Sequence, residues 1–172
     1  CVAVSPMSLP PVQRFESSNG VTIYRISCQA FPGLVAHCYL VLGAGPVTLV
    51  DTGSGYGDST RQVLAGFDAI RAEFSESVSI GDVRRVLITH GHLHHFGGLA
   101  QVNRPIAAEV GIHELDRWVL VSYEERVLVA TKGMAFYLDR AGVDPTRRSE
   151  LLELYSLGKQ HVRSVPVDLT LT

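Results

Sequence analysis

Cysteine is scarce in this 172-residue sequence, which has only three, at positions 1, 28 and 38. No two of them form a C-x-x-C pair, and the odd number leaves at least one thiol unpaired. This usage fits a reducing compartment better than a disulfide scaffold, so we expect a cytoplasmic protein. Cys28 and Cys38 are expected to be small buried side chains on neighbouring strands.

An excess of charge of either sign is also missing. The chain has 15 Lys and Arg against 17 Asp and Glu, a formal net charge of -2, and its basic residues are scattered. The chain therefore has no basic patch that would attract a phosphate backbone, and we expect no nucleic acid partner. The longest apolar stretch, Leu34–Val50, is broken by His37, Gly43, Gly45 and Pro46. A bilayer requires about 20 apolar residues in a row, so we expect no membrane partner.

Repeats, low-complexity tracts and linkers are absent from the sequence, whereas apolar residues make up 46% of it. That proportion is sufficient for a hydrophobic core in a chain of this length. We therefore expect residues 1–172 to be one continuous piece of a single domain.

The first half of the sequence predicts a sheet followed by a helix. Residues up to Gly20 read as an irregular lead-in. Three β-rich runs separated by Pro and Gly predict an antiparallel meander, over Val21–Cys28, Ala36–Leu42 and Val47–Asp51. A helix is predicted to begin after a cap at Asp58 or Ser59, with one apolar stripe of Val63, Phe67, Ile70 and Phe74.

The second half alternates strands and helices, which indicates an α/β fold. Strands are predicted at Val86–Ile88, at Ile106–Ala108 and in the alternating residues 165–171, and a short helix from Leu99. Residues 114–140 and a segment opened by Asp144 and Pro145 predict helices. Their predicted inward side chains are Val127, Ala130, Met134, Tyr137, Leu138, Leu151, Leu154 and Tyr155. Trp118, Tyr123 and Phe136 are either core residues or walls of a substrate pocket.

Four of the seven histidines, His90, His92, His94 and His95, lie within six positions. In an extended segment the first three would project to one side and His95 to the other. Imidazoles are good zinc ligands, and a catalytic zinc site keeps three protein ligands and an open position. A solvated turn or an adventitious nickel site is the structural alternative.

The segment from Val86 to Gly98 reads V-L-I-T-H-G-H-L-H-H-F-G-G. It closely resembles the metallo-β-lactamase-fold hydrolases, whose hallmark is an apolar strand, then Thr-His-x-His-x-Asp-His, then Gly-Gly near a helix start. The upstream V-D-T-G at Val50–Gly53 is similar to that family's other strand-end motif. The resemblance runs from about Val21 to Thr172. It implies an αββα sandwich with the metal site at the strand ends.

By this resemblance His90 and His92 match ligands of a first metal ion, and His95 matches a ligand of a second. Zn²⁺ is the implied metal, as one or two ions, with iron or manganese as alternatives. His94 departs from the pattern, because the family has Asp there. A neutral imidazole brings no negative charge, so the second site is expected to be weaker or differently occupied. Fewer anionic ligands also leave an ion more electrophilic.

Asp51 belongs to a Leu-Val-Asp-Thr-Gly-Ser run that is also typical of an aspartic protease. Such an enzyme needs two carboxylates that share a proton, from two copies or a homodimer, and only one copy occurs here. The dimeric protease is therefore a remote alternative. Asp51 is expected either to support the histidine loop by accepting hydrogen bonds or to form a turn before Gly53.

The resulting hypothesis is a metal-dependent hydrolase that uses metal-activated hydroxide on an ester-like bond of a small molecule, a thioester, lactone or phosphoester. His90, His92 and His95 hold the metal, His94 is an atypical ligand or proton relay, and Asp51 supports them. A degenerate, non-catalytic metal-binding module is the alternative. The chain is expected to be the N-terminal half of the sandwich plus a helical insert, incomplete at its C-terminus and completed by the missing half or by a second chain.

Overall fold

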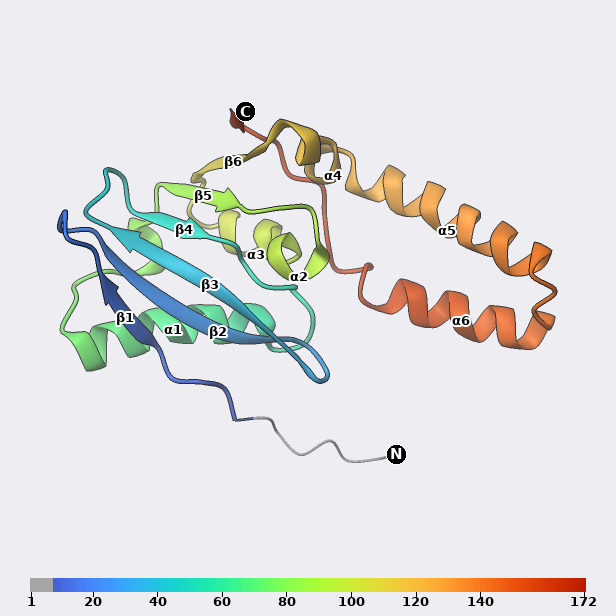
Figure 1. Ribbon diagram of the computed structural model, residues 1–172, viewed down its shortest axis with the longest axis horizontal. Coiled ribbons are helices and arrows are strands. Elements are labelled where there is room, and N and C mark those ends of the chain that lie inside the picture. Colours follow the sequence, from blue (N-terminus) through green and yellow to red (C-terminus); the bar gives the residue numbers. More distant parts are fainter. Residues whose placement is uncertain (1–7) are drawn as a thin grey trace.

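The computed structural model describes residues 8–172, so Cys1 lies outside the described residues. Its centre is one sheet whose seven strands follow sequence order from β1 to β7 (Figure 1). The first four strands are antiparallel, and the last three join them in parallel. The strands are β1 (Gln13–Glu16), β2 (Thr22–Phe31), β3 (Leu34–Leu42), β4 (Thr48–Val50), β5 (Arg85–Ile88), β6 (Glu109–His113) and β7 (Leu169–Leu171).

Most of the predicted strands are confirmed, with three corrections. Of the strand predicted over residues 165–171, only Leu169–Leu171 forms one. The prediction of an irregular lead-in was wrong for Gln13–Glu16, which forms the fully exposed edge strand β1 and has no apolar alternation to reveal it; residues 1–7 of the lead-in lie outside the described residues. The strand predicted at Ile106–Ala108 begins three residues later, at Glu109. Asn103 explains the shift, because its side-chain amide binds both the N–H and the C=O of Ala108 and holds a turn there.

The helices on one face of the sheet bury the core. The helix α1 (Ser59–Phe74) lies on β2 and buries Val63, Phe67 and Ile70, as predicted. Cys28 and Cys38 are buried on β2 and β3 beneath this layer, also as predicted. The short helices α2 (Leu93–Phe96) and α3 (Leu99–Asn103) add Phe96, Leu99 and Val102 to the same core.

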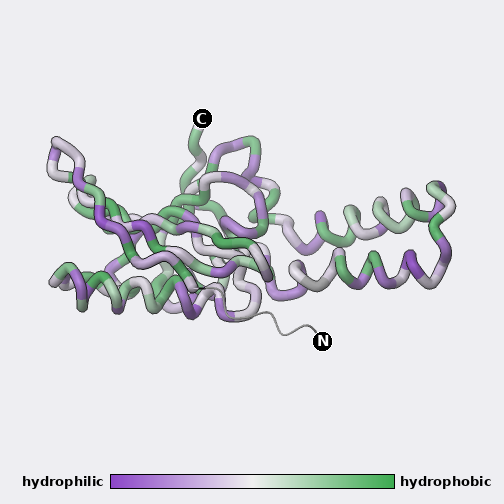
Figure 2. The backbone as a smooth tube through the Cα atoms, turned by 60° about the horizontal axis from the view of Figure 1, so that its bottom comes forward, coloured by the Kyte–Doolittle hydropathy of each residue, from purple (hydrophilic) through white to green (hydrophobic). Residues whose placement is uncertain are grey.

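Most of the remaining helical elements follow β6. They are a one-turn segment η2 (Glu114–Asp116), α4 (Arg117–Val121), α5 (Tyr123–Arg140) and α6 (Pro145–Leu157), and another such turn, η1 (Ile80–Asp82), precedes β5. Figures 1 and 2 show α5 and α6 as a hairpin that projects away from the sheet. Asp144 caps α6 by accepting from the backbone of Thr146, and Gly142 turns the chain with φ 71°.

This projection overturns part of the predicted packing. Leu138 is buried as predicted, but Tyr137 and Leu154 are 67% and 62% exposed, and Ala130 is exposed too. The helices α5 and α6 pack mainly against each other, and the face that they share is narrow. The apolar stripe of each helix is wider than this face, so part of the stripe stays exposed. No helix in the described part of the chain is long and apolar enough to cross a membrane.

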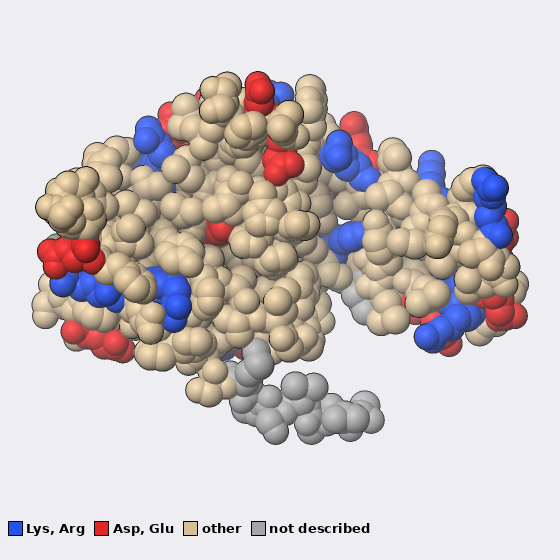
Figure 3. All heavy atoms as spheres, in the orientation of Figure 1, with Lys and Arg blue, Asp and Glu red and all other residues tan. Residues whose placement is uncertain are grey.

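Within residues 8–172, the face of the sheet opposite α1 carries no helix (Figure 1). Its half-exposed apolar side chains are Val35, Tyr39, Val41, Val50 and Leu87. Figure 3 shows few charged side chains in the middle of this view, whereas Lys, Arg, Asp and Glu gather at the edges and on the hairpin. One sheet with helices on one face is the arrangement of one half of an αββα sandwich, as predicted.

Candidate metal centre

The histidine loop lies where three parallel strands end together. Asp51 directly follows β4, Thr89 and His90 follow β5, and His113 ends β6. This edge, beyond the carboxyl ends of parallel strands, is where α/β proteins place their ligands. The sheet thus brings the two sequence motifs together.

Asp51 is the buried centre of this edge, with 2% of its surface exposed. Its Oδ1 accepts the backbone N–H of Thr89 at 2.8 Å, and its Oδ2 accepts the Thr89 hydroxyl at 2.8 Å. Oδ2 also accepts Nδ1–H of His95 at 2.7 Å. The Asp51 backbone is left-handed, with φ 61°, a conformation that Asp tolerates better than most residues. One carboxylate therefore ties the turn after β4 to both ends of the histidine loop.

These hydrogen bonds fix the tautomers of two imidazoles. His95 donates from Nδ1 to a carboxylate, so its Nε2 carries a free lone pair. Thr89 spends its hydroxyl hydrogen on Asp51, so it accepts from Nδ1–H of His90, 3.0 Å away. His90 is thereby held in the same tautomer, with a free Nε2. An imidazole whose other nitrogen donates to a carboxylate or hydroxyl is a typical metal ligand.

The backbone of the loop differs from the predicted extended segment. Leu93–Phe96 is a helical turn, and His92 precedes it as the capping residue. His94 and His95 are therefore adjacent on a helix, and the prediction that His95 points away from the other histidines was wrong. The ring centroid of His95 lies 4.2 Å from that of His90 and 4.3 Å from that of His94.

All four imidazoles lie close together. The ring centroid of His90 is 4.6 Å from that of His92 and 6.4 Å from that of His94, and the last two are 5.7 Å apart. Two imidazoles on one zinc ion have centroids roughly 5 Å apart, given Zn–N bonds of about 2.1 Å. As they stand, however, no three His, Cys, Asp or Glu side chains among residues 8–172 are placed to hold an ion. Side-chain rotations would have to aim the nitrogens at one point.

Burial and the neighbouring imidazoles lower the pKa of two of these rings. Burial lowers the pKa of His90, and the nearby His95 and His92 lower it further. The pKa of His94 is lowered for the same reasons. A neutral imidazole is the form that binds metal.

The two glycines of the motif let the loop pack against Asp51–Ser54. A Cβ on Gly97 would overlap the carbonyl oxygen of Ser54, and one on Gly98 would overlap that of Thr52. The same contact is closed by hydrogen bonds, from Thr52 N–H to the His95 carbonyl and from Gly98 N–H to the Gly53 carbonyl. The Gly-Gly pair is thus a packing requirement of the centre.

Asp116 is a residue of this centre that the sequence interpretation missed. Its Oδ2 accepts the backbone N–H of Gly91 at 2.9 Å. With His90, Gly91 and His92 it lines a small hollow of about 160 Å³. The signal in the sequence was an acidic residue just after a strand that ends at the same edge. Its neighbour His113 is exposed and instead accepts from the backbone of Leu115.

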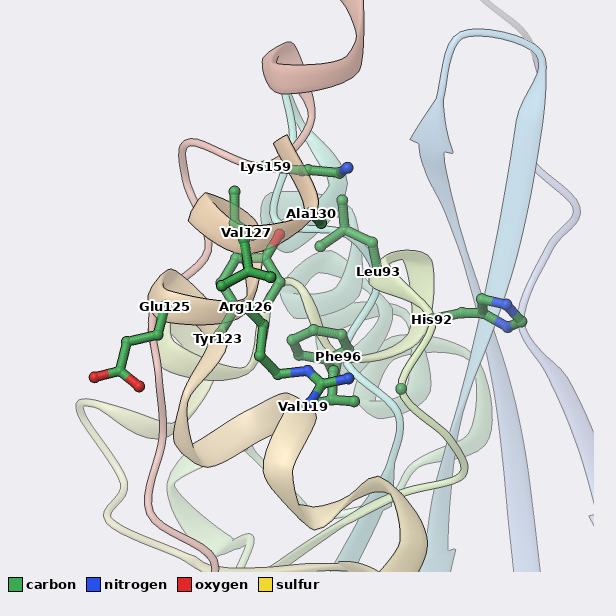
Figure 4. Close-up of a pocket in the computed structure, with 12 residues that line it drawn as sticks. His92, Leu93, Phe96, Val119, Tyr123, Glu125, Arg126, Val127, Ala130 and Lys159 are labelled. Atoms are coloured by element: carbon green, nitrogen blue, oxygen red, sulfur yellow. The ribbon is translucent and has the colours of Figure 1, made fainter. Parts of the chain in front are cut away.

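A larger pocket of about 670 Å³ adjoins the loop and also contacts Gly91 and His92 (Figure 4). Tyr123 of α5 forms part of its wall and is also a buried residue of the hydrophobic core, which confirms the core role considered for this side chain. Its hydroxyl is buried without a hydrogen-bond partner in the described residues, and burial raises its pKa to about 12. Trp118 and Phe136 are 59% and 63% exposed, so neither is a core residue.

Solved metallo-β-lactamases share this fold. GOB-18 from Elizabethkingia meningoseptica is 18% identical with a TM-score of 0.54, covering 100% of this chain and 51% of its own. The Y228A mutant of FEZ-1 from Legionella gormanii is 13% identical with a TM-score of 0.56, covering 97% and 49%. A metallo-β-lactamase with a HARLDQ motif from Cronobacter sakazakii is 18% identical with a TM-score of 0.53, covering 94% and 48%.

The chain spans 51% or less of the length of these solved structures. No curated protein matches it. The family model of the metallo-β-lactamase superfamily matches residues 32–166, which include every residue of the histidine loop and Asp51. With the fold described above, this match shows that the chain belongs to the metallo-β-lactamase superfamily.

Proposed function

We propose that this protein is a metal-dependent hydrolase of ester-like bonds, a thioester, lactone or phosphoester, with His90, His92 and His95 as metal ligands. Membership of a superfamily of mostly hydrolytic, metal-binding proteins supports the general class. The specific observation that carries the proposal is the hydrogen-bond network of Asp51. It leaves the Nε2 atoms of His90 and His95 unprotonated, so that both can bind a metal ion, on rings whose centroids are 4.2 Å apart.

The donor set fits a zinc ion, with iron or manganese as alternatives for a nitrogen-rich site. A divalent ion held there would supply a Lewis acid that polarises the scissile carbonyl or phosphoryl group and acidifies water. Asp51 positions His95 directly and His90 through Thr89, and Asp116 fixes the intervening backbone at Gly91.

His94 has a different task in this proposal. Its ring makes no hydrogen bond within residues 8–172, and it lies beside His95 with centroids 4.3 Å apart. An imidazole has one donor and one acceptor nitrogen, so it can take a proton from water and return it to a leaving group. His94 is therefore assigned as a proton relay or an atypical ligand.

Metal analysis and an ester panel test the proposal together. We expect purified protein to contain zinc, iron or manganese, and to hydrolyse at least one thioester, lactone or phosphoester when Zn²⁺ or Mn²⁺ is supplied. His90→Ala should lose at least 100-fold in kcat/KM, since a ligand is removed. His161→Ala is the matched control, because that exposed ring contacts Tyr56 at 6.0 Å between centroids and not the cluster.

The replacement of Asp by His94 favours one competing function, a non-catalytic metal-binding module. A folded protein that binds metal and hydrolyses no member of the panel would establish that module instead. The dimeric aspartic protease has no support in the geometry. The Asp51 carboxylate is buried and already accepts from Thr89 and His95, so a second carboxylate has no access to it.

A further inference from the structure

The pocket beside the histidine loop, named here the α5 pocket, has an apolar wall. Its lining residues come from the loop, α2, α4, α5 and the segment after α6, and are Gly91, His92, Leu93, Phe96, Val119, Tyr123, Glu125, Arg126, Val127, Val129, Ala130 and Lys159. Tyr123, Val127 and Ala130 are four and three positions apart on α5, so they share one face of the helix. The Tyr123 ring packs edge-on against Phe96, with centroids 5.5 Å apart. A pocket of about 670 Å³ is within the usual size of small-molecule sites.

The α5 pocket and the hollow beside His90 share a wall. Gly91 and His92 line both of them. A Cβ on Gly91 would come within 3.0 Å of the Val119 side chain, which itself lines the α5 pocket. Glycine at position 91 therefore allows the wall between the α5 pocket and the hollow beside His90 to be thin. A molecule in the α5 pocket would end next to the histidine loop.

Two cationic side chains line this pocket, Lys159 and Arg126, and of these two only Arg126 has no side-chain partner within residues 8–172. The ammonium of Lys159 lies over the ring of Tyr155, 2.8 Å from its centroid. The Arg126 guanidinium makes no ion pair or side-chain hydrogen bond within residues 8–172. Figure 4 shows it reaching across the pocket toward Val119 and Phe96, while the carboxylate of Glu125 points away. An apolar pocket with an unpaired cation is complementary to an apolar group that ends in an anion.

We propose that the α5 pocket binds the acyl group of an ester-type substrate, with the hydrocarbon chain against Phe96 and Val127, and that Arg126 pairs with the carboxylate released on hydrolysis. This inference rests on the proposed function. In the reaction, water adds to the acyl carbon, the bond from that carbon to the ester oxygen or thioester sulfur breaks, and a carboxylic acid and an alcohol or thiol leave. The acid ionises at neutral pH and becomes the anion that Arg126 meets.

Binding of octanoate to the full chain tests the pocket without relying on catalysis. By isothermal titration calorimetry we expect octanoate to bind more tightly than butyrate, by about twofold to fourfold for each methylene. Ala130→Trp fills the pocket from an exposed helix position, so it should abolish binding and still fold. Leu128→Trp is the matched control, since Leu128 is 63% exposed on the same helix and does not line the pocket.

The charge is tested separately. Arg126→Met should weaken octanoate binding about tenfold, the usual effect of losing one charged hydrogen bond. Arg140→Met is the control on the same helix, because the Arg140 guanidinium lies over Phe136, 5.7 Å from the ring centroid, outside the pocket. Octanoate that binds wild type and Ala130→Trp equally, or does not bind wild type at all, overturns the inference.

An ester series then distinguishes this inference from the proposed function. With one leaving group and acyl chains of increasing length, kcat/KM should rise with each methylene, and Ala130→Trp should flatten the rise. Hydrolysis that is independent of chain length would refute the acyl pocket and leave the hydrolase intact. No hydrolysis of any ester, with octanoate still bound at the α5 pocket, would refute the proposed function and leave a carboxylate-binding site.

Discussion

Replacement of Asp51 by Asn gives the most direct test of how the centre is organised. Asparagine keeps the shape of the side chain and also tolerates the left-handed backbone at φ 61°, so the change is confined to charge and hydrogen bonding. One of its two terminal atoms becomes an NH₂ group. If its oxygen keeps the Thr89 N–H, the NH₂ faces Nδ1–H of His95, where Oδ2 now accepts at 2.7 Å.

Two donors that face each other force His95 to change tautomer. Its Nδ1 would then accept, its Nε2 would carry the proton, and the lone pair needed for a metal would be lost. Loss of such a supporting carboxylate typically costs 10-fold to 100-fold in metal affinity, so we expect a decrease of about that size for zinc. The free energy of unfolding should fall by about 2–3 kcal/mol, because charged hydrogen bonds of a buried group are weakened.

Zinc affinity is measured by competition with a chromophoric chelator, and stability by urea unfolding. Asp58→Asn is the matched control, because Asp58 lies at the exposed start of α1 and its carboxylate pairs with Arg61 rather than with the cluster. It should leave zinc affinity unchanged. An Asp51→Asn variant that is folded and binds zinc as tightly as the wild type would show that Asp51 does not set the His95 tautomer.

Three further changes test other parts of the centre. His94→Asp should raise the metal content and tighten a second ion, and unchanged stoichiometry by elemental analysis would count against the ligand assignment. Asp116→Asn should lower zinc affinity several-fold in the same chelator assay, because the hold on Gly91 N–H weakens; equal affinity would exclude a positioning role. Gly98→Ala should cost about 1–3 kcal/mol in urea unfolding, since its Cβ overlaps the Thr52 carbonyl, whereas Gly133→Ala, with open space around it, should be neutral or stabilising.

The sequence predicted the central fold well because its elements are encoded locally. The β2–β3 hairpin alternates buried and exposed side chains around Pro32 and Gly33, and α1 has a single apolar stripe. The helical hairpin of α5 and α6 was predicted in its extent but not in its packing. Side chains such as Tyr137 and Leu154 have the right periodicity for a core, and only the tertiary position of the hairpin leaves them exposed.

The sequence predicted which residues of the candidate centre lie close together, and predicted less of their geometry. The four histidines and Asp51 could be named because each belongs to a recognisable motif that directly follows an apolar strand. The orientation of His95 was wrong because a four-residue helical turn, Leu93–Phe96, has too few residues to show a helical period. Asp116 and Arg126 come from segments beyond β6, and their proximity to the loop depends on how α4 and α5 fold back.

The presence of His94 where the family has Asp also connects the proposed hydrolase with the proposed acyl pocket, because it changes the charge of the centre. The four imidazoles carry no formal charge in their metal-binding form, and within residues 8–172 Asp51 is the carboxylate that hydrogen-bonds to one of them. A divalent cation bound there would therefore keep a net positive charge toward solvent, with Arg126 adding a second positive centre at the neighbouring pocket. Both positive charges attract carboxylates. A carboxylate would bind less tightly to the centre of the His94→Asp variant, because the aspartate there would already supply a negative charge. Release of the acid product is therefore expected to limit turnover, and octanoate should inhibit the wild type more strongly than His94→Asp in steady-state assays.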